Sequence, residues 1–536
     1  MPASQSNIDS STPMGANVTS GGVTFRTWAP AASAVYICYD GNWTQNDANL
    51  LVKNPQGYWS GFIPGIKDGT QCKFYVVGPG SSGYKRDPYA RELAVSPPFP
   101  SSNSVIRDPN LYQWHDHEFR PPAFNDLVIY QYHVGTFYRA AGAPGGRFLD
   151  ILDKIDYLAA LGINAIQPLP ISEFPTQFSM GYNGVDIFSP DDLYAVTDPT
   201  ELNDYARKID ALLSARGAAL LNAGQIQSPI NQLKAVVDVC HMYGLAVIFD
   251  VVYNHAGGGF DDDSIYFYDR EANGNNNNSQ FFTDQGWAGG LLFAYWKQEV
   301  RQFLIDNAVQ LANEYHLDGF RYDEVSVITS NSTNGWGFCQ DLTGTLRSDR
   351  PPAIQIAEHW PVDPSVVAGK DSGGAGFDST WADGLRDNIR QAISQAAAGA
   401  QSYVDMDSIA SNLRGQVDTN QQWKAVQYIE SHDEVYVGRS ARMPRLADGS
   451  NSRSWYARSR SRVATGIILT APGIPMLFMG EEFLEDKQWS DDPNLFATNS
   501  IWWGGLEPGG DKSMQDFLRF TQDLAHLRAN RPALRG

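Results

Sequence analysis

The chain has 536 residues, enough for a large hydrophobic core and two or three domains. Its formal net charge of −20 and sequence pI of about 4.8 argue against nucleic acid or an anionic membrane surface as a partner. No apolar run approaches the ~18 residues of a membrane span, and the polar N-terminus lacks a signal-peptide core, so we expect a cytoplasmic protein.

The pattern along the chain predicts four segments. Residues 1–20 are expected to form a disordered tail. Between 21 and 98, short strand-like runs are punctuated by Gly and Pro, which predicts a β-sandwich. Residues 99–125, rich in Pro, Ser and Asn, are expected to be a linker. From 126 to 536 strand-like and helix-like segments alternate, which predicts an α/β domain with a parallel sheet.

Four apolar runs in this last segment end in acids or histidines. Each has the length of a strand buried on both faces, and each follows a helix-like segment. The runs are LAVIFDVVYNH (245–255), LDGFRYDEV (317–325), AIQIAEHW (353–360) and AVQYIESHDEV (425–435). Polar residues at the carboxyl ends of parallel strands are typical of an active site.

The second run places Arg321 and Asp323 two residues apart, so both side chains lie on one face of a strand. A guanidinium beside a carboxylate keeps the carboxylate ionised and orients it, as a nucleophile requires. A buried ion pair with a purely structural role is the alternative for this motif taken alone.

Together the four runs resemble, in order, the four signature regions of the α-amylase family (glycoside hydrolase family 13). The resemblance implies a TIM (β/α)8 barrel and three catalytic acids: Asp323 as nucleophile, Glu358 as general acid/base, and Asp433 as the acid that grips sugar hydroxyls. It implies further substrate-binding residues, which are Arg321, His255, His432, Tyr182, Asp250 and Asn254. It implies no cofactor and no catalytic metal.

Two regions outside the signature runs also bear on the family resemblance. The runs GVTFRTWAP and YKRDPYARE resemble the N-terminal, carbohydrate-binding-module-like domain of branching and related enzymes, where either a glucan-binding or a structural role is expected. An excursion at 256–290 is expected to wall one side of the cleft. Its acidic run, Asp261–Asp263, predicts either a solvated loop or a structural calcium site. The C-terminal β-domain of related enzymes is expected to be absent.

The acceptor of the reaction separates the candidate functions. SHDE (431–434) and the N-terminal domain favour a 1,4-α-glucan branching enzyme that transfers chains to 6-hydroxyls. DVVYNH (250–255) is closer to hydrolases of the amylase or trehalohydrolase type, and the phrase EHW at 358–360 departs from the branching-enzyme pattern. A catalytically silent glucan-binding protein is the third alternative. In each case an α-glucan or maltooligosaccharide is the expected partner, and the oligomeric state is left open.

Three residues are expected on the acceptor side of the cleft because they directly follow the predicted acids. These residues are His359, Trp360 and Glu434.

Overall fold

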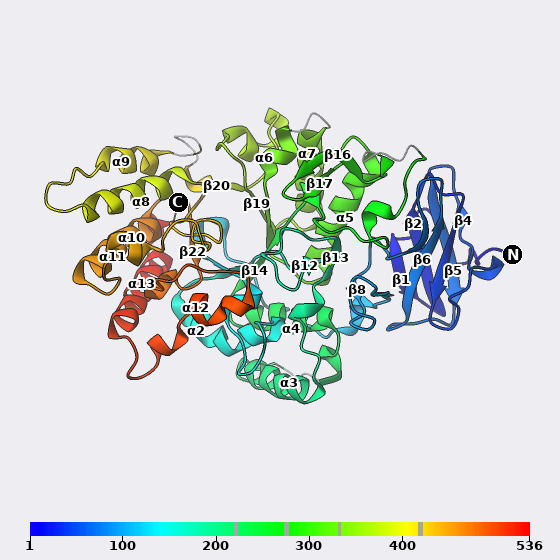
Figure 1. Cartoon of the computed structure of the whole chain (residues 1–536), viewed down its shortest axis with the longest axis horizontal. Helices are drawn as coiled ribbons and strands as arrows, with labels where there is room; N and C mark the ends of the chain where they lie inside the picture. The colour runs from blue at the N-terminus through cyan, green and yellow to red at the C-terminus, as the bar shows by residue number, and fades with distance from the viewer. Residues whose placement is uncertain (219–222, 273–277, 331–333, 416, 418–421, 536) are drawn as a thin grey trace.

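A computed structural model describes residues 1–218, 223–272, 278–330, 334–415, 417 and 422–535. Figure 1 shows a β-rich N-terminal domain at one end of an elongated molecule. The barrel occupies the centre, and helices of the C-terminal half gather at the opposite end.

Two sheets form the N-terminal domain, as predicted. The first is antiparallel, in the order β1 (Gly15–Thr19), β2 (Gly22–Trp28), β5 (Tyr58–Pro64), β4 (Val52–Lys53). The second runs β3 (Ala34–Tyr39), β6 (Gln71–Val77), β9 (Ser104–Val105), β8 (Glu92–Leu93), with β7 (Ser82–Lys85) also paired to β6. Phe25 of the first sheet meets Phe74 of the second edge to face, with ring centroids 6.4 Å apart. The two sheets therefore share one core.

The predicted disordered tail is wrong over part of its length. Strand β1 lies within 1–20 and pairs with β2 from Gly15 to Thr19, because its Ala16 supplies an apolar side chain for the core. Strand β9 and the buried Tyr112 likewise lie inside the predicted linker, and the Tyr112 hydroxyl donates to Asp238 at 3.0 Å. The domain boundaries at 98 and 126 stay a prediction.

Eight parallel strands close into the predicted barrel, with the N-terminal sheets packed at its side. In barrel order the strands are β10 (Ile129–Tyr132), β11 (Ala165–Pro168), β14 (Ala246–Val251), β18 (Gly319–Tyr322), β19 (Ile354–Ala357), β20 (Ser379–Ala382), β21 (Ala425–Gln427) and β22 (Ile474–Phe478). Every residue of these strands is buried, which explains their continuous apolar character. The four predicted runs therefore end at the same face of the barrel.

The helices outside the barrel strands follow the amphipathic pattern. In α5 (Gln298–Glu314), Val300, Phe303, Leu304 and Leu311 are buried at helical spacing. The other principal helices are α2 (Ile155–Leu161), α3 (Pro199–Ser214), α4 (Pro229–Met242), α7 (Gly335–Asp349), α8 (Gly384–Ala397), α9 (Met406–Arg414), α11 (Trp455–Thr470) and α13 (Lys512–Asn530). Among the described residues, none of the helices is long and apolar enough to cross a bilayer.

The excursion at 256–290 contains a small antiparallel sheet of β15 (His255–Ala256), β17 (Gly290–Phe293) and β16 (Phe282–Trp287). Figure 1 shows β16 and β17 on the flank of the barrel that carries α5, toward the N-terminal domain. Residues 273–277 of the predicted excursion lie outside the described residues.

The acidic run of the excursion is bound by bases of the N-terminal domain. Arg86 pairs with Asp261 at 2.7 Å, and Lys73 pairs with Asp263 at 2.7 Å. Lys85 donates to the backbone carbonyl of Asp262, whose side chain is exposed. Two of the three carboxylates thus have protein cations as partners.

Candidate active site

Arg321 is the hub of the polar cluster at the carboxyl ends of the strands. It is fully buried on β18, and the register places it beside Asp250 of β14. Its Nη1 donates to both Asp250 carboxylate oxygens, at 2.8 and 3.0 Å, and to Asp323 Oδ1 at 3.0 Å. One guanidinium therefore orients two carboxylates, as predicted for an Arg and an Asp two residues apart on a strand.

Asp323 directly follows β18 and is held from two sides. Besides Arg321, Asn254 Nδ2 donates to Asp323 Oδ2 at 2.8 Å and to the Asp323 carbonyl at 2.9 Å. Burial raises the pKa of the Asp323 carboxyl, Arg321 and Asn254 oppose the rise, and the neighbouring Glu358 adds to it. Arg321 and Asn254 therefore favour the ionised form of Asp323 against burial and the nearby Glu358.

Glu358 follows β19 and faces the same cluster. Its Oε2 accepts from the backbone N–H of Glu324 at 2.8 Å and lies 2.6 Å from Arg321 Nη2. That Arg321 nitrogen is close enough for an ion pair but is not aligned for a hydrogen bond. Trp360 Nε1 donates to the other oxygen, Oε1, at 3.3 Å. Oε1 therefore has the weaker contact and is the oxygen better placed to carry a proton.

Asp433 follows β21 and is the most exposed of the three predicted acids, with 41% of its side chain accessible. Burial would raise the pKa of its carboxyl, but His432, 3.2 Å away, and Arg439, 2.9 Å away, outweigh it and hold that pKa below its usual range. Asp433 is thus ionised at neutral pH, whereas burial and the neighbouring Glu358 raise the pKa of Asp323.

A cavity of about 320 Å³ opens over Asp323, Glu358 and Asp433. Tyr182 and His255 line the same cavity. The Tyr182 ring stacks on His432 with centroids 5.1 Å apart, and its hydroxyl donates to Asp250 at 2.8 Å. Three predicted acids and several predicted sugar contacts therefore meet at one hollow.

His255 also lines this cavity. Its Nδ1 bonds to Asn254, and its Nε2 has no hydrogen-bond partner within the described chain. Burial lowers the pKa of His255 to about 4, so the ring is neutral at pH 7. A neutral, unpaired nitrogen suits a hydroxyl group of a bound molecule.

A second cavity, of about 450 Å³, adjoins the first. Glu358, Glu324 and Asp433 line both cavities, whereas Asp323 lines only the smaller one. The remaining wall of the larger cavity is built by Trp360, Trp381, Asp383, Arg386, Tyr428, Ser431, Glu434, Arg439 and Ser440. The site thus has two compartments that meet at Glu358.

Comparisons with known proteins agree with this architecture. Residues 13–90 match the family described as carbohydrate-binding module 48 (isoamylase N-terminal domain). The 1,4-alpha-glucan branching enzyme GlgB 1 of Xanthomonas campestris pv. campestris (strain 8004) is 26% identical over 555 residues, covering 96% of this chain and 66% of the relative. The chain thus spans about two thirds of the length of that curated relative.

Solved structures share the fold. A putative alpha amylase from Salmonella typhimurium superposes with a TM-score of 0.73 at 21% identity, covering 97% of this chain and 86% of that chain. The GBS pullulanase SAP in complex with maltotetraose gives a TM-score of 0.71 at 20% identity, covering 98% and 74%.

The chain resembles the α-amylase family in its N-terminal module, in curated relatives that match along most of its length, and in its fold. Within that family of glycoside hydrolases and transglycosylases it resembles branching enzymes over most of its length. The resemblance inferred from the four signature runs is confirmed.

The three residues expected on the acceptor side differ in their position relative to the larger cavity. Trp360 and Glu434 line the larger cavity. Glu434 is paired there with Arg390 at 3.2 Å and lies 3.6 Å from Arg386. A two-arginine clamp of this kind fixes the Glu434 carboxylate to the protein.

The expectation for His359 is wrong. It lines neither cavity, and its ring nitrogens lie 2.9 Å from the Pro361 carbonyl and 3.1 Å from the Thr329 hydroxyl. Side chains alternate along an extended segment, so Glu358 and Trp360 point one way and His359 points the other.

Several residues that line the cavities were not predicted from the sequence. Trp287, at the end of β16, and Ala288 line the smaller cavity, so the excursion does wall this compartment. A tryptophan between glycines in a polar loop, GWAGG, was the available signal. Glu324, next to a predicted acid, and the pair Asp383 and Arg386 after β20 were likewise overlooked.

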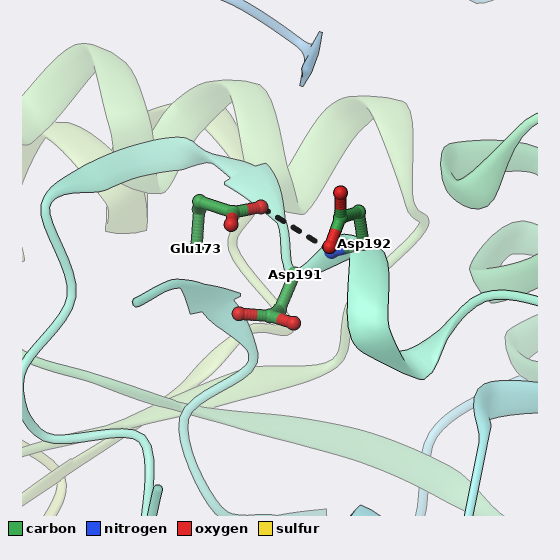
Figure 2. Close-up of side chains that lie close together, drawn as sticks. All are labelled: Glu173, Asp191 and Asp192. Carbon is green, nitrogen blue, oxygen red and sulfur yellow. Dashed lines mark hydrogen bonds between the residues drawn. The ribbon is translucent and has the colours of Figure 1, made fainter. Parts of the chain in front are cut away.

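Another acidic group, away from both cavities, has the ligand types of a metal site. Carboxylate oxygens of Glu173, Asp191 and Asp192 lie within 4.8 Å of one another. Figure 2 shows Glu173 reaching the backbone nitrogen of Asp192, at 3.2 Å. Asp191 accepts from the backbone nitrogens of Phe174 and Leu193. Backbone amides of adjacent segments thus account for the contacts of this cluster, and we assign no ion to it.

Proposed function

We propose that this protein cleaves α-1,4-glucosidic bonds through a covalent glycosyl-enzyme intermediate and transfers the released chain to a 6-hydroxyl, as a 1,4-α-glucan branching enzyme. The observation that carries the proposal is the division of the site into two compartments that meet at Glu358 and Asp433, with Asp323 in only one of them. A retaining mechanism needs such an arrangement, with a nucleophile under the donor sugar and an acid/base between donor and acceptor.

In this proposal Asp323 attacks the anomeric carbon of a sugar in the smaller compartment. Glu358 gives its proton to the glucosidic oxygen as the bond to the leaving chain breaks. Arg321 and Asn254 direct their N–H groups at Asp323, which aims the nucleophile and opposes the rise of its pKa on burial. Once Glu358 has lost its proton, it serves as the base for the incoming acceptor.

Tyr182, His255, His432 and Asp433 bind the donor sugar in this scheme. The ionised Asp433 accepts hydrogen bonds from sugar hydroxyl groups, the neutral His255 offers an unpaired nitrogen, and the Tyr182 ring supplies an apolar face. The binding partner is therefore an α-glucan or a maltooligosaccharide. A cytoplasmic location stays a prediction.

The larger compartment supports transfer to a sugar. Trp360 gives it an aromatic wall, and aromatic faces pack well against sugar rings. A transferase must bind its acceptor well enough to compete with water at ~55 M, so a sizeable compartment beyond Glu358 is required. An acceptor chain of more than one sugar unit would meet this requirement for tight binding.

Hydrolysis is the second candidate, because the phrase DVVYNH is closer to hydrolases and EHW departs from the branching-enzyme pattern. The two functions differ only in the acceptor. Incubation of the protein with amylose, followed by proton NMR of α-1,6 linkages and of reducing ends, separates them.

For a branching enzyme we expect α-1,6 signals to grow while reducing ends stay nearly constant. Reducing ends that grow without α-1,6 linkages would replace the branching assignment with hydrolysis. The Asp323→Asn variant, measured in parallel, controls for contaminating activities.

A further inference from the structure

Glu324 has an unusual backbone for its position. It stands between Asp323 and the start of α6 (Val325–Ser330), and its φ of +40° lies in the left-handed region that non-glycine residues rarely adopt. Such conformations persist where the surroundings enforce them, commonly at functional sites. Here the turn aims the Glu324 N–H at Glu358 Oε2, 2.8 Å away, while the Val325 N–H donates to the Glu358 carbonyl at 2.7 Å.

The Glu324 side chain reaches the place where the two compartments meet. It is half-buried and lines both cavities, as Glu358 and Asp433 do. Its Oε2 accepts from the Ser326 hydroxyl at 2.9 Å. The backbone and the side chain of this residue therefore have separate tasks, the first toward Glu358 and the second toward the cavity.

The charges around Glu324 differ from those around Asp323, Asp433 and Glu434. Asp323 is paired with Arg321, Asp433 with Arg439, and Glu434 with Arg390. In the part of the chain that the structure describes, Glu324 forms no ion pair with an arginine or lysine. Burial and the nearby Glu358 raise the pKa of its carboxyl. A carboxylate without a cation retains its full capacity to accept hydrogen bonds from neutral donors.

We propose that the Glu324 carboxylate binds hydroxyl groups of the sugar unit that lies next to Glu358 on the acceptor side, and so helps to determine which acceptor is used. This inference rests on the proposed function and adds a substrate-binding residue to it. Sugar hydroxyls are neutral donors, and the junction of the two compartments is where the first acceptor-side sugar must lie.

The kinetic test separates the side chain from the backbone. Glu324→Gly keeps the left-handed turn and the N–H toward Glu358 but removes the carboxylate, whereas Glu324→Gln removes only the charge. Fluoride release from α-maltosyl fluoride reports the donor step, and transfer to maltotetraose reports the acceptor step.

For Glu324→Gly we expect the kcat/KM for maltotetraose to fall about tenfold to hundredfold more than the rate of fluoride release, through KM. We expect Glu324→Gln to lie between this variant and wild type. The matched control Ser326→Ala removes the hydroxyl that contacts Glu324 and should change the acceptor KM by less than about threefold. Equal losses in both steps would show that Glu324 acts through Glu358 and would overturn the proposal, as would no loss in either.

A binding measurement makes the test independent of turnover. In the Asp323→Asn background, calorimetry with maltoheptaose, which is long enough to span both compartments, gives a Kd with and without Glu324→Gly. We expect the Kd to rise about tenfold, and an unchanged Kd would refute the role of Glu324. Absence of fluoride release from the wild type would instead refute the proposed function, so the two failures are distinguishable.

Discussion

Replacing Arg86 by methionine tests how the acidic excursion is held. Arg86 is 1% exposed, and its guanidinium contacts Asp186 at 3.0 Å, Asp261 at 2.7 Å and the Pro100 carbonyl at 2.7 Å. Methionine keeps much of the length and the apolar stem but removes the charge. Asp186, whose side chain is 5% exposed, would then be buried without a cation.

Removing one partner of a buried ion pair costs about 3–5 kcal/mol, because the remaining charge stays desolvated. The loss of the Asp261 contact adds little to this cost, since the Asp261 side chain is 18% exposed and water can replace the arginine. We therefore expect Arg86→Met to lower the free energy of unfolding by about 3–5 kcal/mol at pH 8.

The loss should depend on pH in a defined direction. Burial raises the pKa of Asp186, and Arg86 opposes that rise. Without Arg86 the pKa of Asp186 rises further, and a carboxyl with a raised folded-state pKa destabilises the protein as the pH increases through that pKa. The destabilisation should therefore be smaller at pH 5 than at pH 8.

Urea unfolding followed by tryptophan fluorescence at both pH values measures these differences. Asp262→Asn is the matched control: its side chain is exposed, so a change within about 0.5 kcal/mol is expected. A loss below about 1 kcal/mol for Arg86→Met, together with stabilisation of the wild type by millimolar calcium, would refute the ion-pair interpretation and favour a metal site at the acidic run.

Three further predictions concern the site and the barrel. Asp323→Asn should remain folded by circular dichroism and lose several orders of magnitude of turnover on amylose, because an amide cannot form the glycosyl ester; a tenth of wild-type turnover would contradict this. Glu358→Gln should be nearly inactive on amylose but much less impaired on α-maltosyl fluoride, whose leaving group needs no proton; equal losses would count against an acid role. Burial lowers the pKa of His241, but the hydrogen bonds that its ring donates to Asp116 and Asp318 outweigh that effect and raise the pKa to about 9. Because the folded pKa exceeds the unfolded value of about 6.5, roughly 3 kcal/mol of stability should be present below pH 6.5 and lost as the pH rises through 9. Urea unfolding of His241→Gln should show no such loss between these pH values.

Local sequence pattern was sufficient for a parallel sheet with acids at the carboxyl ends of its strands, and the family resemblance supplied the closed barrel. A barrel strand leaves a continuous apolar run, and the residues after it must lie at one face, so Asp323, Glu358 and Asp433 could be placed together without coordinates. The same reasoning, applied consistently, would have excluded His359, since alternation turns it away from its neighbours.

Contacts between distant segments could not be predicted in this way. The partners Arg86 and Asp261 are 175 positions apart, and nothing in either local sequence specifies the other. The acidic run alone is compatible with a calcium site or a solvated loop. It carries no sign that bases from another domain bind it. The position of Trp287 at the cavity could not be predicted for the same reason, because it depends on how the whole excursion folds back.

These contacts couple the N-terminal domain to the active site. The excursion that supplies Trp287 to the smaller cavity is anchored on that domain through Arg86, Lys73 and a hydrogen bond between Thr27 and Tyr268. If the anchor positions the wall, loosening it should weaken donor binding without altering the acids, so Arg86→Met should raise the KM for α-maltosyl fluoride severalfold and leave kcat within about twofold. Steady-state fluoride release at a temperature well below unfolding measures both constants.

A Trp287→Ala variant should reproduce the KM effect, and adding Arg86→Met to it should raise the KM little further, since both substitutions act on one wall. Fully additive effects of the two substitutions would show that the domain and the wall are independent.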